Sequence, residues 1–249
     1  GWTKQKALAD LTAHLQVAVE VELATIPIYL YTYYSINRKP EGFPATSLSR
    51  FADEAGATIM SVAVEEMLHM SLASNILFSL GKQPELYQKS PSPYPTNLPG
   101  HAKLNPQKKP MSIPLAKLSV AQLGQFLDIE YPATVDAPPE GNNWDTIGQI
   151  YSYIRCLIQS DLISDDDFGY APHQIQAENY SPNSIDTAYP SNDFQLTCPV
   201  PSGQEGSASK VAQYASREDS HAGNAALITI NSKMTALQAI ATIDSQGEG

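Results

Sequence analysis

The chain has 249 residues and a formal net charge of −11. A chain of this length can bury a substantial core as one domain, or at most two. Its excess of acid with no basic run argues against a nucleic-acid partner or an anionic membrane surface. No apolar run is expected to reach the length that crosses a bilayer, and no basic-then-apolar leader opens the sequence, so we expect a cytoplasmic or already processed protein.

Two long helices are predicted in the first third of the chain. Apolar residues recur at helical spacing over residues 2–35, and Pro27 is expected to interrupt and kink that helix. A second helix is predicted over residues 47–80, and Gly81 is expected to end it. Because the connection between them is short, the two helices predict an antiparallel hairpin, half of a four-helix bundle.

Shorter helices and two long loops make up the rest of the chain. Eight prolines make regular structure improbable in residues 82–118, which we interpret as a functional lid or an ordered excursion over the bundle. A second loop-rich excursion is expected over residues 161–209. Helices are predicted at 120–131, 147–160, 209–216 and 232–245. The pattern as a whole predicts one all-α domain over residues 1–249.

A Glu-x-x-His set in the second long helix is the main candidate for chemistry. Glu66 and His69 are three residues apart, so both project from one helix face. Apolar residues surround the pair almost all the way round, which indicates a buried helix. A carboxylate and an imidazole are costly to bury without partners. We therefore interpret the pair as metal ligands rather than as a solvated acid beside a core histidine.

The first helix offers one inward carboxylate. Glu20 and Glu22 lie on opposite sides of the helix, and Glu22 is the one in phase with the apolar positions. Glu22 is therefore predicted as a third ligand rather than a surface acid, with Tyr29 about two turns along the same face. Two interpretations of Glu65 stay open, an acceptor that orients the His69 imidazole or a solvent-facing glutamate.

The remaining histidines and acids are given structural roles. His14 is expected on the helix surface, and His101 lies in a proline-bearing loop without a partner at ligand spacing. His221 follows a serine and an aspartate, but adjacent residues cannot form a catalytic triad without a fold that converges them. The aspartates at 161 and 165–167 lack the glycine and final glutamate of an EF-hand, so they predict a solvated acidic turn.

Three segments of the sequence match one known family. They are residues 16–34 (QVAVEVELATIPIYLYTYY), 64–84 (VEEMLHMSLASNILFSLGKQP) and 243–249 (IDSQGEG). Weaker agreement covers YPTNLPG at 94–100, FLDIEYP at 126–132 and TIGQIY at 146–151. Together these segments resemble the ferritin-like domain family of the iminophenyl-pyruvate dimer synthases, which includes the ferritin-like part of the violacein-pathway synthase.

The resemblance implies an all-α ferritin-like four-helix bundle with long proline-rich loop excursions and a metal site. It implies Glu22 as the lone glutamate of the first helix, and Glu66 and His69 as the Glu-x-x-His of the second. Glu130 and Glu248 are further metal ligands by resemblance.

Two of these implied ligands have plainer alternatives. By position alone, Glu130 could be a helix-end surface acid and Glu248 a tail residue. The family continues past its QGEG motif into another helical segment with a further histidine. Because this sequence stops at Gly249, we expect an incomplete second half-site.

Two functions are predicted. The first is a metal-dependent oxidoreductase of secondary metabolism, with Glu22, Glu66 and His69 as its catalytic ligands and mono- or dinuclear iron as its cofactor. By resemblance, its partner would be a small-molecule substrate, an amino-acid-derived imine or a similar compound. The alternative is a non-catalytic ferritin-like module that binds metal or a partner, because fold alone does not establish function. Tyrosines 29, 31, 33 and 34 are interpreted as a pocket lining, an electron relay or packing residues, and a homodimer is left open.

Overall fold

A computed structural model of the chain describes residues 1–37, 47–88, 93–102, 104, 111–134, 137–169, 172–175 and 227–247. These ranges hold five α-helices, one turn of 3₁₀ helix and, in place of strands, two isolated bridges. The elements are α1 Lys4–Tyr34, α2 Ser47–Ser79, α3 Val120–Ile129, α4 Ile147–Gln159, η1 Asp165–Asp167 and α9 Lys233–Gly247. The helix predicted at 209–216, His221 and Glu248 lie outside the described residues.

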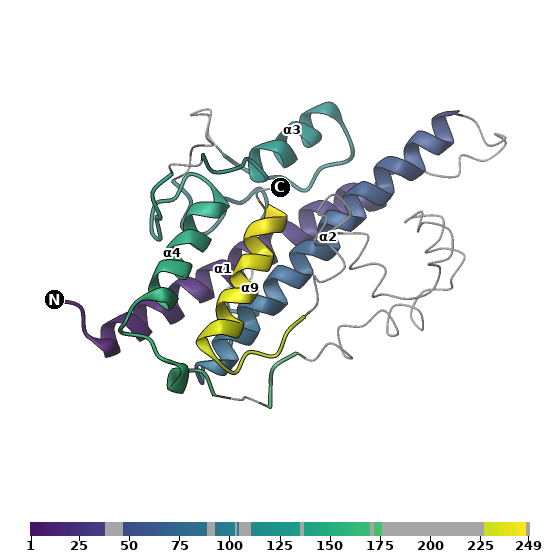
Figure 1. The fold of residues 1–249 in the computed structure, drawn as a ribbon. Coiled ribbons are helices and arrows are strands. Elements are labelled where there is room, and N and C mark those ends of the chain that lie inside the picture. Colours follow the sequence, from purple (N-terminus) through teal and green to yellow (C-terminus); the bar gives the residue numbers. More distant parts are fainter. Residues whose placement is uncertain are drawn as a thin grey trace.

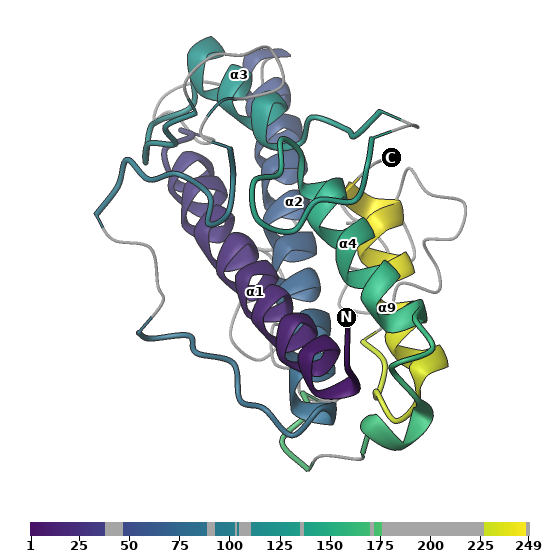
Figure 2. The same cartoon turned by 90° about the vertical axis from the view of Figure 1, so that its left-hand side faces the viewer.

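Four of these helices form a closed bundle. The long helices α1 and α2 run antiparallel beside each other, α4 contacts α1, α9 contacts α2, and α4 and α9 contact each other (Figure 1). Figure 2 shows the same arrangement from the side, with the α4–α9 pair packed beside the α1–α2 pair. The prediction of an all-α four-helix bundle is confirmed. The remaining helix, α3, lies outside this ring and packs on α1 through the rings of Phe126 and Tyr29, whose centroids are 4.5 Å apart.

Local sequence signals account for the ends of the two long helices. The side chain of Thr3 accepts a hydrogen bond from the Lys6 amide at 3.3 Å and caps the start of α1. Gly81, at φ +73°, ends α2 as predicted, because this left-handed conformation is one that glycine adopts without strain. The amides that follow α2 bond back to its last turn, Gly81 to the Phe78 carbonyl and Lys82 to the Leu77 carbonyl, which is the Schellman pattern.

The proline in α1 does not divide the helix. α1 is continuous from Lys4 to Tyr34, so the prediction that Pro27 interrupts it is wrong. Proline removes one amide donor and crowds the turn before it. The Tyr94 hydroxyl donates to the carbonyl of Ala24 in that turn at 2.9 Å, which gives this carbonyl a partner from outside the helix.

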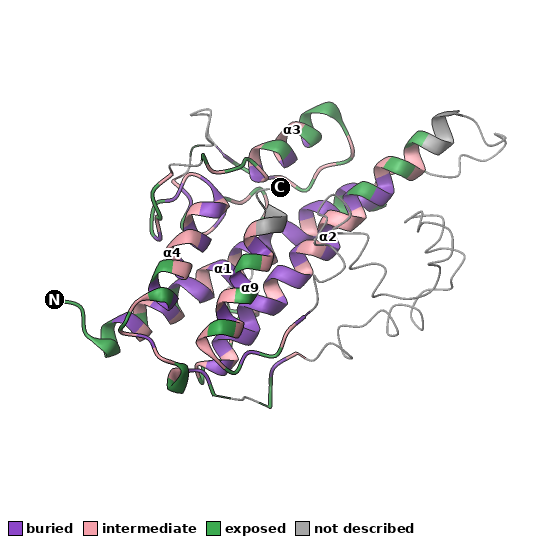
Figure 3. Ribbon diagram, viewed as in Figure 1, coloured by how far each residue is buried: buried purple, intermediate pink, exposed green. Residues whose placement is uncertain are grey.

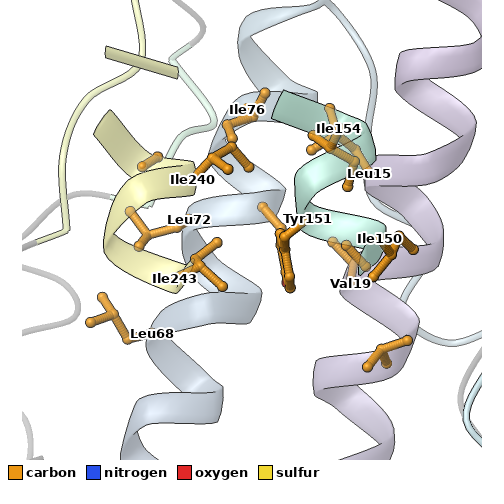
Figure 4. Packing of buried hydrophobic residues seen from close by; sticks show 14 of the residues in the cluster. Leu15, Val19, Leu68, Leu72, Ile76, Ile150, Tyr151, Ile154, Ile240 and Ile243 are labelled. Atoms are coloured by element: carbon orange, nitrogen blue, oxygen red, sulfur yellow. The ribbon is translucent and has the colours of Figure 1, made fainter. Parts of the chain in front are cut away.

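A single apolar core fills the bundle. Buried residues follow the inward faces of the four helices, while exposed residues follow their outward faces (Figure 3). Isoleucine, leucine and valine side chains from all four helices point toward one another in the space between them (Figure 4). Leu15, Leu72, Ile154 and Ile240, one from each helix, are fully buried. This core positions the polar residues of the candidate site, which lie among these apolar side chains.

The hydropathy of α1 corrects one expectation. α1 is long and apolar enough, by length and composition, to cross a membrane, although no such run was expected from the sequence. In the most apolar window of this helix, 61% of the residues are buried inside the bundle. Core helices of soluble proteins have the same composition, and the packing of α1 against α2 and α4 accounts for its apolar character.

The proline-rich segment 82–118 follows the bundle surface without forming a helix in its described part. Its buried residues Leu98, Met111 and Ile113 pack onto the bundle core, and Thr96 pairs with Ile113 through two backbone hydrogen bonds. This arrangement agrees with an ordered excursion over the bundle.

The prediction that His14 lies on the helix surface is wrong. Its side chain is buried, with Nδ1 2.8 Å from the Asp10 carbonyl and the ring packed on Tyr153. The Tyr153 hydroxyl donates to the Asp10 carboxylate at 2.6 Å, which joins α1 to α4. Gly141 approaches so closely that a Cβ there would lie 2.4 Å from His14 Nε2. The loop before α4 therefore covers a face of α1 that the periodicity of α1 alone leaves exposed.

The acidic turn is partly paired rather than simply solvated. Residues 165–167 form the 3₁₀ turn η1, and Asp167 lies 2.9 Å from Lys4 Nζ. Asp165 accepts from the Lys233 amide at 2.8 Å, at the first turn of α9. The turn thus ties both the start of α1 and the start of α9 to the end of α4.

Candidate metal centre

Three side chains predicted as metal ligands meet between α1 and α2. Glu22, Glu66 and His69 each offer one ligand atom within 4.8 Å of the others, and all three side chains are buried. His69 Nδ1 lies 3.8 Å from Glu22 Oε2 and 4.0 Å from Glu66 Oε1. Within the described part of the chain, no other group of three acid, cysteine or histidine side chains comes this close.

The helix periodicities explain why these three residues converge. Glu66 and His69 share one face of α2 because they are three positions apart. Glu22 shares the face of α1 that buries Ala18 and Tyr29, which confirms that it points inward. Glu20, on the other side of α1, is half-buried and accepts a hydrogen bond from the side chain of a neighbouring glutamine.

A small cavity connects this cluster to the other helices. Its volume is about 20 Å³, enough for one water molecule or ion. Besides the three clustered residues, its wall includes Glu130 at the end of α3 and Asp244 of α9. Neither lysine nor arginine lines it among the described residues. Among the described residues, four carboxyl groups and one imidazole therefore face a space that no lysine or arginine reaches.

Each of the three glutamates accepts a hydrogen bond from a hydroxyl group. The Tyr151 hydroxyl of α4 donates to Glu22 Oε1 at 2.5 Å. Thr25, one turn beyond Glu22, donates to Glu66 Oε2, and Tyr29 donates to Glu130 Oε1. Burial raises the pKa of both phenols well above 10, so both hydroxyls keep their protons and remain donors.

Burial also changes the charge state of the carboxyl groups. Desolvation raises the pKa of Glu22 from 4.5 to about 7 and that of Glu130 to about 8. It raises the pKa of Glu66 well above its usual value, and the neighbouring Glu22 charge adds to the effect. In the metal-free protein these groups are partly or fully protonated near neutral pH, since like charges this close cannot all ionise in a buried site.

This donor set fits a metal ion. Carboxylate oxygens and an imidazole nitrogen are ligands that iron and similar divalent ions accept. A bound cation would replace the protons that the buried carboxyl groups otherwise retain. The three hydroxyl donors fix the orientation of the carboxylates, as partners of metal ligands commonly do.

The other predicted site residues have mixed outcomes. Glu130 lines the cavity wall, contrary to the interpretation as a plain surface acid, whereas Glu248 lies outside the described residues. Glu65 is half-buried, and its role toward His69 stays a prediction. Of the tyrosine run, Tyr29 contacts the site, and the side chains at 31 and 34 are exposed. The described residues of the segment 82–118 contribute nothing to the cavity wall.

Sequence reasoning missed three polar residues at the site, Thr25, Tyr151 and Asp244. Thr25 carries a detectable signal, because it follows Glu22 by one helical turn. Tyr151 falls on the apolar face of α4, where a tyrosine needs a hydrogen-bond partner for its hydroxyl. Asp244 pairs with Arg155 at 2.7 Å and has no sequence neighbour that marks it as a site residue.

A four-helix bundle that encloses glutamates and a histidine defines the ferritin-like class of proteins. A family model described as ferritin-like matches residues 15–249, and the chain belongs to this ferritin-like family.

Two similar proteins extend this comparison. Over 173 residues the chain is 27% identical to a 2-imino-3-(indol-3-yl)propanoate dimerase of Chromobacterium violaceum. This match covers 62% of the chain but only 16% of the dimerase, so the chain corresponds to a small part of that relative. The crystal structure of a ferritin-like protein from Caulobacter vibrioides has a TM-score of 0.59 and 24% identity, and the match covers 99% of this chain and 69% of the other. This second likeness supports the fold alone.

Proposed function

We propose that the chain is a metal-dependent oxidoreductase that uses iron to act on an aromatic, amino-acid-derived imine. The observation that carries this proposal is the buried cluster of Glu22, Glu66 and His69, within 4.8 Å of one another in a cavity whose described wall contains no lysine or arginine. A protein gains nothing in stability from burying the three carboxyl groups of Glu22, Glu66 and Glu130 in a cavity that no lysine or arginine lines among the described residues. Function is the reason we infer for keeping them.

The proposed roles of the residues follow from their contacts. Glu22, Glu66 and His69 would hold the metal, and Tyr151 and Thr25 would fix the two carboxylates in position. Bound iron would supply redox chemistry toward dioxygen. Glu130, with a pKa raised to about 8, can hold or release a proton near neutral pH at the cavity wall.

The substrate class comes from the relative. The dimerase of Chromobacterium violaceum acts, by its name, on an indolyl imino acid. We propose a related imine as the substrate of this chain. Joining two imine molecules by one new bond removes two hydrogen atoms, and we propose that dioxygen takes up these two electrons and two protons as hydrogen peroxide. The protein would work in the cytoplasm on a small molecule.

Metal analysis of the purified protein tests the proposal. After expression in iron-replete medium, we expect about one or more iron ions per chain. The double variant Glu66→Ala/His69→Ala should lose this iron, while Glu20→Ala, on the opposite side of α1, should keep it. Absence of iron from the wild-type protein, or its retention in the double variant, would refute the assignment.

A second candidate is a non-catalytic metal-binding or partner-binding module. The observation in its favour is that the aligned region makes up only 16% of the dimerase, so other parts of that relative could carry the reaction. Turnover distinguishes the two. Consumption of the imine formed from tryptophan by the iron-loaded chain supports the enzyme, whereas iron binding without consumption supports the module.

A further inference from the structure

A surface groove runs along α3, outside the cavity that holds the metal-ligand cluster. Its volume is about 720 Å³, within the range of small-molecule sites. Leu127 and Tyr131 line it and are 72% and 39% exposed, which is a large exposure for apolar and aromatic side chains. Gly124 also lines it, and a Cβ at this position would have no atom within 4 Å.

Glu130 connects this groove to the buried centre. It is the residue that lines both the groove and the internal cavity, as far as the described residues show. Its backbone amide bonds to the Phe126 carbonyl at the end of α3, and its carboxylate accepts from Tyr29. The residue as a whole is half-buried, and its carboxyl group is buried against Tyr29. Glu130 therefore lies where the two spaces approach each other.

The charge of the groove restricts its occupant. Asp128 and Glu130 both line it, and no lysine or arginine does so among the described residues. An anionic group placed in the groove would be repelled by the Asp128 carboxylate, whereas a cationic nitrogen would be attracted to it. An aromatic ring of the occupant can stack on the Tyr131 ring. A cation over the face of the Tyr131 ring is also attracted by a cation–π interaction.

We propose that this groove binds the aromatic, nitrogen-bearing end of a small molecule and holds its nitrogen beside Glu130, at the wall of the metal cavity. This inference rests on the proposed function and specifies how the substrate would be oriented. The aromatic ring lies against Leu127 and Tyr131, and the imine nitrogen points toward Asp128 and Glu130. A carboxylate on the same molecule stays at the solvent side of the groove.

Ligand-detected NMR on the metal-free protein tests this proposal with three probes. Tryptamine is a cation, indole is neutral, and indole-3-propionate is an anion with the same ring. We expect tryptamine to bind most tightly, indole next, and indole-3-propionate about tenfold more weakly than tryptamine. Equal or tighter binding of the anion, or no binding of any probe, overturns the proposal.

Two variants of α3 locate the binding. Gly124→Phe should fill the groove and weaken tryptamine binding about tenfold, without changing the iron content of the protein. Leu123→Phe places the same phenyl ring at an exposed position of the same helix that does not line the groove, and it should leave binding unchanged. If Gly124→Phe binds tryptamine like the wild type while circular dichroism shows it folded, the groove is not the site. If Gly124→Phe does not fold, Asp128→Asn replaces it, and an unchanged preference for tryptamine over indole-3-propionate then overturns the proposal.

The outcome separates this inference from the proposed function. Probe discrimination without any bound iron would sustain the groove and refute the metal-dependent enzyme. Iron bound by Glu22, Glu66 and His69 without probe binding would refute the groove alone.

Discussion

Replacement of Glu22 by glutamine is expected to stabilise the metal-free protein increasingly as the pH rises from 5 to 8. Glu22 is 1% exposed and lies beside Glu66 in a cavity wall whose described residues include no lysine or arginine. Glutamine has nearly the same shape and keeps an oxygen that can accept the Tyr151 hydrogen bond. The substitution therefore removes the ionisable proton while it preserves most of the packing.

The magnitude follows from the pKa of the Glu22 carboxyl, which burial raises from 4.5 to about 7. Between these two values the folded protein holds a proton that the unfolded chain has released, so the free energy of unfolding falls as pH rises. The stability that goes with the protonated Glu22 carboxyl is fully present below pH 4.5 and is lost as pH rises through 7. Since one pKa unit corresponds to about 1.4 kcal/mol, the raised pKa of Glu22 lowers the free energy of unfolding by about 3 kcal/mol at pH 8 and by about 1 kcal/mol at pH 5, relative to a variant without this ionisable group.

Urea unfolding of the chelator-treated proteins at pH 5, 6, 7 and 8 measures this effect. The difference in unfolding free energy between Glu22→Gln and the wild type should grow by about 2 kcal/mol across the range. Glu20→Gln, two residues away and outside the cavity, should follow the wild type at every pH. If the difference in unfolding free energy stays constant with pH, or shrinks, the pKa of Glu22 is not raised by burial and the reasoning is refuted.

Three further predictions concern metal binding and packing. Tyr151→Phe keeps the ring but removes the donor to Glu22, so competition with a coloured chelator should show metal affinity about 10-fold to 100-fold weaker with helical content unchanged. Gly141→Ala places a Cβ 2.4 Å from His14 Nε2 and should lower stability by about 1–3 kcal/mol in thermal unfolding, whereas Gly124→Ala, with open space at its Cβ and a helical backbone, should be neutral or slightly stabilising. Saturating ferrous iron under anaerobic conditions should raise the Tm of the wild type but not that of Glu66→Ala/His69→Ala. At 1,000 times the Kd, binding should raise the free energy of unfolding of the wild type by about 4 kcal/mol. An equal Tm shift in both proteins would contradict the assignment.

The helices and the ligand cluster were predictable because both depend on local periodicity. The apolar spacing predicted α1, α2, α3, α4 and α9 to within about two residues at each described end. The predicted α3 is too long at its end, because Pro132 disfavours helical geometry in Tyr131, the residue before it, and the helix ends at Ile129. The inward direction of Glu22 also followed from phase alone, because its neighbours on the same face are apolar.

The rest of the site depends on contacts between distant segments. Tyr151 meets Glu22 across 129 positions of sequence, and Tyr29 meets Glu130 across 101. No spacing rule within one helix reports such contacts, so the donors to the carboxylates could not be found from the sequence. His14 was misplaced for the same reason, because the loop that buries it comes from a distant part of the chain, around Gly141.

Anomalous diffraction from crystals of the iron-loaded protein tests the central claim most directly. Data collected on both sides of the iron absorption edge would locate the metal without reference to any expected site. We predict an iron peak within bonding distance of Glu22, Glu66 and His69, with Tyr151 still donating to Glu22. Iron bound elsewhere, with this cluster occupied by water alone, would contradict the account.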